Sequence, residues 1–159
     1  MIIKDGILID IEESDLVRTN VRQNFLAMLK GVQEKEFILK IPEGVKVITK
    51  QAMDHCLYLV NKVEFPKSLE KIEGGTFSGA FALKEVVLPE NLEELGESAF
   101  ENCENLKTVK ILSKKIKEIP ALAFSSCRSL ESIKLPNQIE KLGHHCLSDC
   151  ENLTSLNLP

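Results

Sequence analysis

The chain has 159 residues, of which 43% are apolar, and 24 Asp and Glu residues outnumber 20 Lys and Arg. This length can bury the core of one ordinary domain without disulfide staples. The net charge of −4 leaves no basic excess for phosphates or anionic lipid, and no apolar run approaches the roughly 20 residues of a membrane-spanning helix. Composition thus argues against nucleic-acid binding and membrane insertion.

Residues 1–36 are predicted to form an N-terminal cap. Two short apolar segments, residues 2–3 and 7–11, flank Asp5-Gly6, which is a strong signal for a two-residue hairpin turn. These residues do not share the repeat that follows them, and the open end of a repeat array needs a cover. We therefore expect this segment to cover one end of the array.

A short helix is predicted after the hairpin. Asn20 suits its N-cap, an apolar face runs from Val21 to Leu29, and Gly31 stands just beyond its end. An apolar helical face is usually buried, which favours a part in the cap. A role for this helix in partner binding is the alternative.

Residues 37–159 contain an internal repeat of 23 or 24 residues, counted as five units. An apolar residue followed by proline marks each step, and Leu112 takes the proline position between Pro89 and Pro136. Within a unit, an apolar pair three residues apart is followed by a small residue and then a bulky one. Three residues beyond the bulky residue, the same position holds Cys56, Ala80, Cys103, Cys127 or Cys150.

Each unit closes with an alternating apolar segment, as in Val86 and Leu88, which is typical of a β-strand. A unit of this size cannot bury its own apolar face, so neighbouring units must stack. Parallel strands about 4.8 Å apart would join them into a solenoid. A proline after the last inward residue has no amide to donate and ends the ladder there.

The consensus L-x-x-L-x-L-P-x-x-L-x-x-I-(G)-x-x-A-F-x-x-C resembles the BspA-like class of bacterial leucine-rich repeats. The segment from Leu92 to Cys103 is a close match, whereas Met53, Leu112 and Cys146-Leu147 depart from the consensus. The resemblance implies a leucine-rich-repeat solenoid, a β-rich right-handed superhelix of the α/β type. Its parallel strands would line a concave face used mostly for recognition, and it implies no catalytic residues.

The outward positions of the predicted strands are the candidate partner-binding residues, because they alternate with the buried ones. They form a mostly polar stripe without the Trp, Tyr and Arg residues that dominate interface hot spots. We expect many modest polar contacts with a partner, or binding that needs further repeats; a plain solvated face is the alternative. The stripe consists of Lys40, Lys62, Glu64, Glu85, Val87, Thr108, Lys110, Ser132, Lys134, Ser155 and Asn157.

Cysteine and histidine offer the main alternatives to a binding function. Four of the five cysteines share one repeat position, so a buried column of inert thiols explains them, with bridging of neighbours as the alternative. The cluster from His144 to Cys150 is the densest set of possible metal ligands, but its spacing is not that of a standard zinc site. We expect no metal and no cofactor, and a thiol or metal function at this cluster remains a third hypothesis.

These observations predict a non-catalytic module that binds a protein partner. The alternative is a scaffold or address domain of a larger bacterial surface protein or secreted effector whose activity lies elsewhere. An odd number of cysteines and an N-terminus unlike a signal peptide predict a cytoplasmic location, with export in a larger protein as the alternative. Apolar residues in the last predicted strand, including Leu153 and Leu156, predict a longer array or a covering chain.

Overall fold

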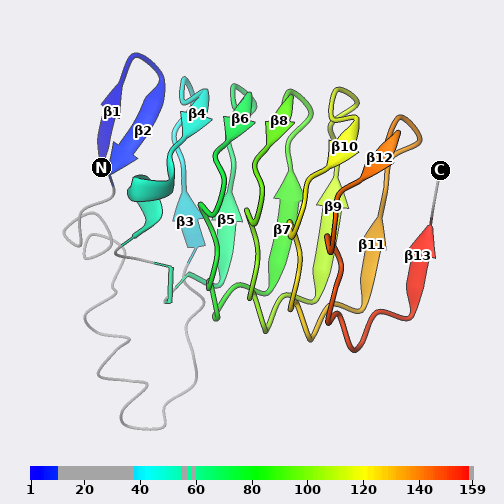
Figure 1. The fold of residues 1–159 in the computed structure, drawn as a ribbon. Helices are drawn as coiled ribbons and strands as arrows, with labels where there is room; N and C mark the ends of the chain where they lie inside the picture. The colour runs from blue at the N-terminus through cyan, green and yellow to red at the C-terminus, as the bar shows by residue number, and fades with distance from the viewer. Residues whose placement is uncertain (11–37, 55–56, 59, 158–159) are drawn as a thin grey trace, which may run out of the picture.

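The computed structural model describes residues 1–10, 38–54, 57–58 and 60–157. Within them the chain coils as a solenoid whose successive turns lie side by side (Figure 1). One sheet runs the length of the solenoid and contains six parallel strands, in an order that follows the sequence. These are β3 (Ile38–Lys40), β5 (Lys62–Glu64), β7 (Glu85–Leu88), β9 (Thr108–Ile111), β11 (Ser132–Lys134) and β13 (Ser155–Asn157).

The repeat spacing sets the register of this sheet. Glu85 pairs with Thr108, and Thr108 pairs with Ser132, so residues 23 or 24 apart in sequence lie opposite each other. The middle residues of the strands, such as Val86, Val109 and Ile133, are buried. The predicted solenoid with parallel strands is thus confirmed.

A second series of short strands runs along another edge of the solenoid (Figure 1). This series was not predictable from the sequence, because an apolar pair three residues apart has neither strand nor helix periodicity over so short a run. The series comprises a five-stranded sheet and a two-stranded one. Its members are β1 (Ile2–Lys4), β2 (Ile7–Asp10), β4 (Val47–Ile48), β6 (Lys71–Ile72) and β8 (Glu94–Leu95), and then β10 (Glu118–Ile119) with β12 (Lys141–Leu142).

The N-terminal hairpin forms as predicted. Strands β1 and β2 pair antiparallel around the Asp5-Gly6 turn, and β2 adds in parallel to β4 of the first repeat. The predicted helix and most of the predicted cap lie outside the described residues. In the described part of the chain, one helical segment is present, the 3-10 helix η1 (Lys50–Met53).

The core is built from equivalent side chains stacked from one unit to the next. The rings of Phe77 and Phe100 stack with centroids 5.1 Å apart, and those of Phe100 and Phe124 stack at 5.6 Å. All three rings are buried. Burying an aromatic ring contributes several kcal/mol, about 3–5 when it is lost to alanine, so this column is a major part of the stabilisation.

In four units the chain also turns at two positions where the backbone has positive φ, namely Gly75 and Gly79, Ser98 and Asn102, Leu122 and Ser126, and His145 and Asp149. Gly75 occupies the first position in one unit, and Leu122 occupies it two units later with φ 58°. A left-handed conformation disfavours side chains with a Cβ, so the tertiary stack holds these residues there. Gly96 has a different reason to be glycine, because a Cβ on it would lie 2.2 Å from the backbone nitrogen of Gly74.

The second series of strands is interrupted between β8 and β10. Leu112 is followed by an apolar residue, Ile116, after four positions, whereas Pro89 is followed by Leu92 after three. The extra residue is accommodated by Ser113, whose buried hydroxyl donates to the carbonyl oxygen of Leu92 and accepts from the amides of Lys115 and Ile116. This hydroxyl fixes the longer turn.

Candidate interaction surface

The outward face of the six-stranded sheet, which we call the strand face, carries the predicted partner-binding residues. Lys40, Lys110, Ser132, Lys134 and Ser155 are exposed there. Partly buried side chains fill the other described positions, while Asn157 lies in β13 with its side chain outside the described set. The partly buried residues are Lys62, Glu64, Glu85, Val87 and Thr108.

Ion pairs link the first strands of this face. The Lys40 Nζ lies 3.3 Å from a carboxylate oxygen of Glu64. Glu85 lies between two lysines, 3.8 Å from Lys62 and 3.6 Å from Lys110. Exposed pairs of this kind contribute about 0–1 kcal/mol each, so a partner could displace them at little cost.

Two shallow grooves lie on the strand face, and Leu112 borders both. The larger, about 690 Å³, lies over β9 and β11, and the smaller, about 320 Å³, lies over β5 and β7. The Leu112 side chain is 49% exposed. Its amide donates to the carbonyl oxygen of Leu88 at 3.0 Å, a bond that the proline of other units cannot make.

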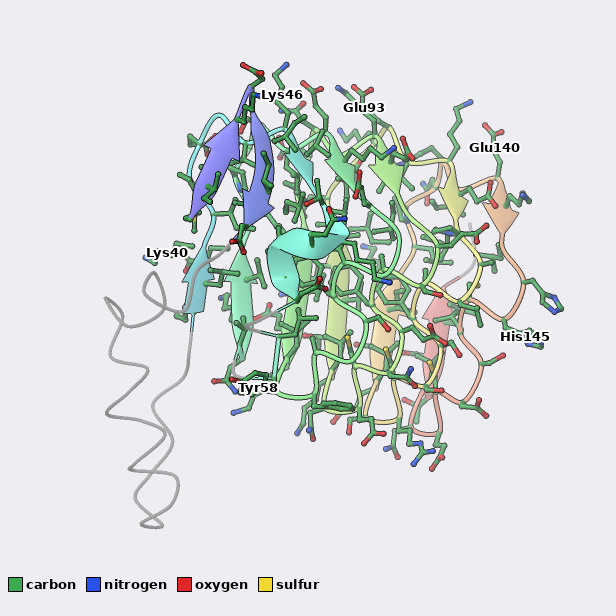
Figure 2. All side chains as sticks on the ribbon, turned by 60° about the vertical axis from the view of Figure 1, so that its left-hand side comes forward. Lys40, Lys46, Tyr58, Glu93, Glu140 and His145 are labelled. Atoms are coloured by element: carbon green, nitrogen blue, oxygen red, sulfur yellow. The ribbon has the colours of Figure 1, made fainter. Side chains whose placement is uncertain are left out.

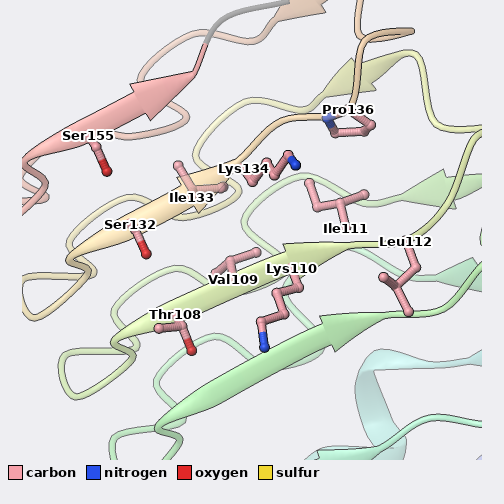
Figure 3. Close-up of a pocket in the computed structure, with 10 residues that line it drawn as sticks. All are labelled: Thr108, Val109, Lys110, Ile111, Leu112, Ser132, Ile133, Lys134, Pro136 and Ser155. Carbon is pink, nitrogen blue, oxygen red and sulfur yellow. The ribbon is translucent and has the colours of Figure 1, made fainter.

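The larger groove has an ordered pattern of side chains (Figure 3). Thr108, Ser132 and Ser155 are in register on three neighbouring strands and form a row of hydroxyl groups. Lys110 pairs in register with Lys134 to form a second row. The strand pattern predicts these five residues as part of the site, but Leu112 lies beyond the predicted strand and differs from the repeat only by replacing a proline.

In the cysteine column, Cys103 and Cys127 are buried, Cys150 is partly buried, and all three thiols are free. The Sγ atoms of Cys103, Cys127 and Cys150 each donate to the carbonyl oxygen of a phenylalanine in the preceding unit, at 3.2 to 3.3 Å. Burial raises the pKa of the Cys103 thiol well above its usual value, and it raises the pKa of Cys150 to about 12. A structural part in packing, as predicted, accounts for these groups; Cys56 lies outside the described residues.

The His144 to Cys150 cluster does not assemble into a ligand set. His144 and His145 are exposed, and Nδ1 of His145 lies 2.9 Å from Oγ of Ser148. Cys146 is buried, and burial raises the pKa of its thiol, the reverse of what activates a nucleophile. Across the described residues no group of three or more His, Cys, Asp or Glu side chains is placed to hold a metal ion.

Further ion pairs join successive units along the edge that carries the second series of strands. Lys46 lies 2.9 Å from Glu70, and Lys117 lies 2.8 Å from Glu140. Figure 2 places Lys46, Glu93 and Glu140 along this edge. The lysines of one unit thus pair with the glutamates of the next, and this edge of the solenoid carries ion pairs.

Two exposed aromatic side chains, Tyr58 and Phe81, were also missed by the sequence analysis. They border a pocket of about 500 Å³ at the turns that lead into the six-stranded sheet, together with Lys107. Their spacing of 23 residues places them at one repeat position, which is the signal that could have revealed them.

Comparison with known structures supports the fold. A leucine-rich repeat protein from Eubacterium ventriosum is 20% identical with a TM-score of 0.60, and one from Bacteroides ovatus is 26% identical with a TM-score of 0.59. They match 79% and 77% of this chain, which spans 40% and 37% of their lengths. A leucine-rich cell surface protein from Faecalibacterium prausnitzii is 24% identical over 76% of this chain and 40% of its own, with a TM-score of 0.51.

A comparison with curated proteins found no significant match. No helix in the described segments is long and apolar enough to cross a membrane. The family model for the BspA type leucine-rich repeat region matches residues 46–159 in six copies. The repeat pattern, the stacked parallel strands and this match agree, and the chain belongs to the BspA-type leucine-rich repeat family.

Proposed function

We propose that this chain is a non-catalytic protein-interaction module that binds its partner on the strand face. The observation that carries the proposal is the in-register display of outward side chains on six parallel strands, with two grooves along them. Equivalent residues from distant parts of the sequence form continuous rows there. Such rows suit an extended contact with a protein surface.

Affinity capture with matched variants tests this proposal. The strand-face variant is Lys62→Ala/Glu85→Ala/Lys110→Ala/Lys134→Ala. The control variant, Lys46→Ala/Glu70→Ala/Lys117→Ala/Lys141→Ala, removes the same charges from the edge that carries the second series of strands. A partner that the parent and the control retain and the strand-face variant loses would support the proposal, provided that all three melt alike.

Loss of the captured partner from both variants to the same extent would contradict the proposal, because binding would then follow net charge and not this face. Capture of no protein by the parent would also count against it. Capture of no protein would favour the second candidate function, which is described next.

The second candidate is a scaffold or address domain of a larger bacterial surface protein or secreted effector. It is favoured by the similarity to a leucine-rich cell surface protein and by the coverage of only about two fifths of that protein. The two candidates imply different locations, the cytoplasm for the first and the cell surface or the medium for the second. Protease treatment of intact source cells, with a blot of the medium for released chain, distinguishes them, because only a surface-exposed chain would be cleaved and only a secreted one would be found in the medium.

A further inference from the structure

Leu112 is the feature of the strand face that the repeat does not explain. Pro42, Pro66, Pro89, Pro136 and Pro159 stand at the equivalent positions of the repeat, and Leu112 instead extends an apolar side chain into solvent between the two grooves. An exposed leucine amid polar side chains has no role in the buried core. It is suited to contact an apolar group from outside the chain.

The groove over β9 and β11, which we call the Leu112 groove, is organised in three bands. Outward residues two positions apart lie about 6.6 Å from each other along a parallel strand. Along β9 and beyond it, the bands are therefore a hydroxyl group at Thr108, an ammonium group at Lys110 and an apolar group at Leu112. Along β11 the equivalent residues are Ser132, Lys134 and Pro136.

The Leu112 groove also differs in charge from the rest of the face. Lys110 and Lys134 are the charged residues that line it, and none of the described residues that line it is acidic. The neighbouring groove contains lysines and glutamates together. Lys110 shares Glu85 with Lys62, and no described carboxylate lies within 4.0 Å of the Lys134 ammonium group.

We propose that the Leu112 groove binds an extended acidic segment of a partner protein in which an Asp or Glu stands two positions from an apolar residue. In an extended segment, alternate side chains face the sheet with the same two-residue spacing. The carboxylate would lie on the lysine band while the apolar side chain packs against Leu112 and Pro136. This inference rests on the proposed function and names the chemistry of the partner.

An acidic peptide fits this groove better than a nucleic acid does. Single-stranded nucleic acids are held by stacking of bases on aromatic side chains, and none of the described residues that line the Leu112 groove is aromatic. The apolar band would also leave a phosphate backbone without a partner. A carboxylate next to an apolar side chain satisfies both bands together.

Selection from a library of short random peptides, displayed and panned against the 159-residue chain, tests the proposal. We expect enrichment of peptides with Asp or Glu two positions from Leu, Ile, Met or Phe, in either order. Raising NaCl from about 0.05 M to about 0.3 M should lower the affinity of these peptides for the chain, because exposed charges are screened. Enrichment of peptides without an acidic residue, or no enrichment, would overturn the proposal.

Single variants then locate the binding site. We expect Leu112→Ser and Lys134→Glu each to lower the affinity for the selected peptide about tenfold or more, a difference of about 1.4 kcal/mol in binding free energy. The matched controls are Leu142→Ser, an exposed leucine in β12, and Lys4→Glu, an exposed lysine in β1, and neither should change the affinity. Equal losses in the variants and their controls would exclude the Leu112 groove.

The same variants separate this inference from the proposed function. If the four-residue strand-face variant loses a captured partner while Leu112→Ser and Lys134→Glu retain it, the strand face binds but not through this groove. If all of them retain the partner, the proposed function fails as well.

Discussion

Single residues in this chain are defined by their position in the repeat, and their chemistry follows from it. The cysteine column shows this directly. Cys103 and Cys127 are fully buried, and each thiol donates to a carbonyl oxygen of the unit before it. Burial raises the pKa of the Cys103 thiol, because it penalises the thiolate, so this thiol is protonated and unreactive.

Cys150 provides the test at this scale, since it is only partly buried and its pKa is raised to about 12 by burial. At pH 8 its thiolate is about 1,000-fold scarcer than that of a thiol with pKa 9.0. Greater nucleophilicity offsets part of this, so we expect alkylation by iodoacetamide to be slower by about tenfold or more. Mass spectrometry of the native chain against a model thiol measures the ratio.

The stabilisation from Cys150 and its alkylation rate both depend on pH, and the raised pKa of the thiol fixes the direction of each change. The folded pKa of Cys150, about 12, lies above the ordinary thiol value of 9.0, so the stabilisation from its protonated form is present below pH 9 and is lost as pH rises towards 12. Its alkylation rate should keep rising beyond pH 9. A rate that levels off near pH 9 would show that this thiol is not desolvated.

Secondary-structure elements in this chain depend on contacts between units. Strands of two residues, such as β10 and β12, have no stability of their own and exist because the next unit supplies a parallel neighbour. The turn after Leu112 accommodates one extra residue, because the Ser113 hydroxyl accepts hydrogen bonds from two amides and donates one to a carbonyl oxygen.

Ser113→Ala tests the part played by that hydroxyl. The substitution leaves a buried carbonyl oxygen and two amides without their partner, which costs about 1–3 kcal/mol. We expect the free energy of unfolding, measured in urea, to fall by that amount, and the unfolding midpoint to move to a lower urea concentration. The control is Ser132→Ala, an exposed hydroxyl on the strand face, which should change stability by less than about 0.5 kcal/mol. An equal effect of both substitutions would contradict the assigned role.

Across the whole molecule, stability is carried from neighbour to neighbour. Neighbouring units contact each other through paired strands, and the three units that carry Phe77, Phe100 and Phe124 also stack these rings. A repeat array of this kind behaves as a sum of unit and interface contributions. Coupling between side chains should therefore be confined to adjacent units.

A double-mutant cycle tests this expectation. Phe77→Leu combined with Phe100→Leu should show a coupling of about 0.5–1.5 kcal/mol, because their rings stack at 5.1 Å. Phe77→Leu combined with Phe124→Leu should be additive within about 0.5 kcal/mol, since a full unit separates the rings. Equilibrium unfolding in urea supplies the free energies. Comparable coupling in both pairs would mean that the array unfolds as one tightly coupled core.

The sequence by itself determined the repeat, its register and the side of each strand that is buried. The reason is that the repeat spacing and the period of two in a strand together assign every side chain to a face. Val109 and its neighbours Thr108 and Lys110 lie as that pattern predicts. The hairpin around Asp5-Gly6 was also predictable, because its turn signal is local.

Only the tertiary structure decided the second series of strands and the form of the candidate site. A strand as short as β6 leaves no periodicity in the sequence, since its partner lies about 23 residues away. The exposure of Leu112 depends on how the adjoining units pack, and so does its position between the two grooves. Contacts between units are set by stacking in space, and a linear pattern records only that the stacking occurs.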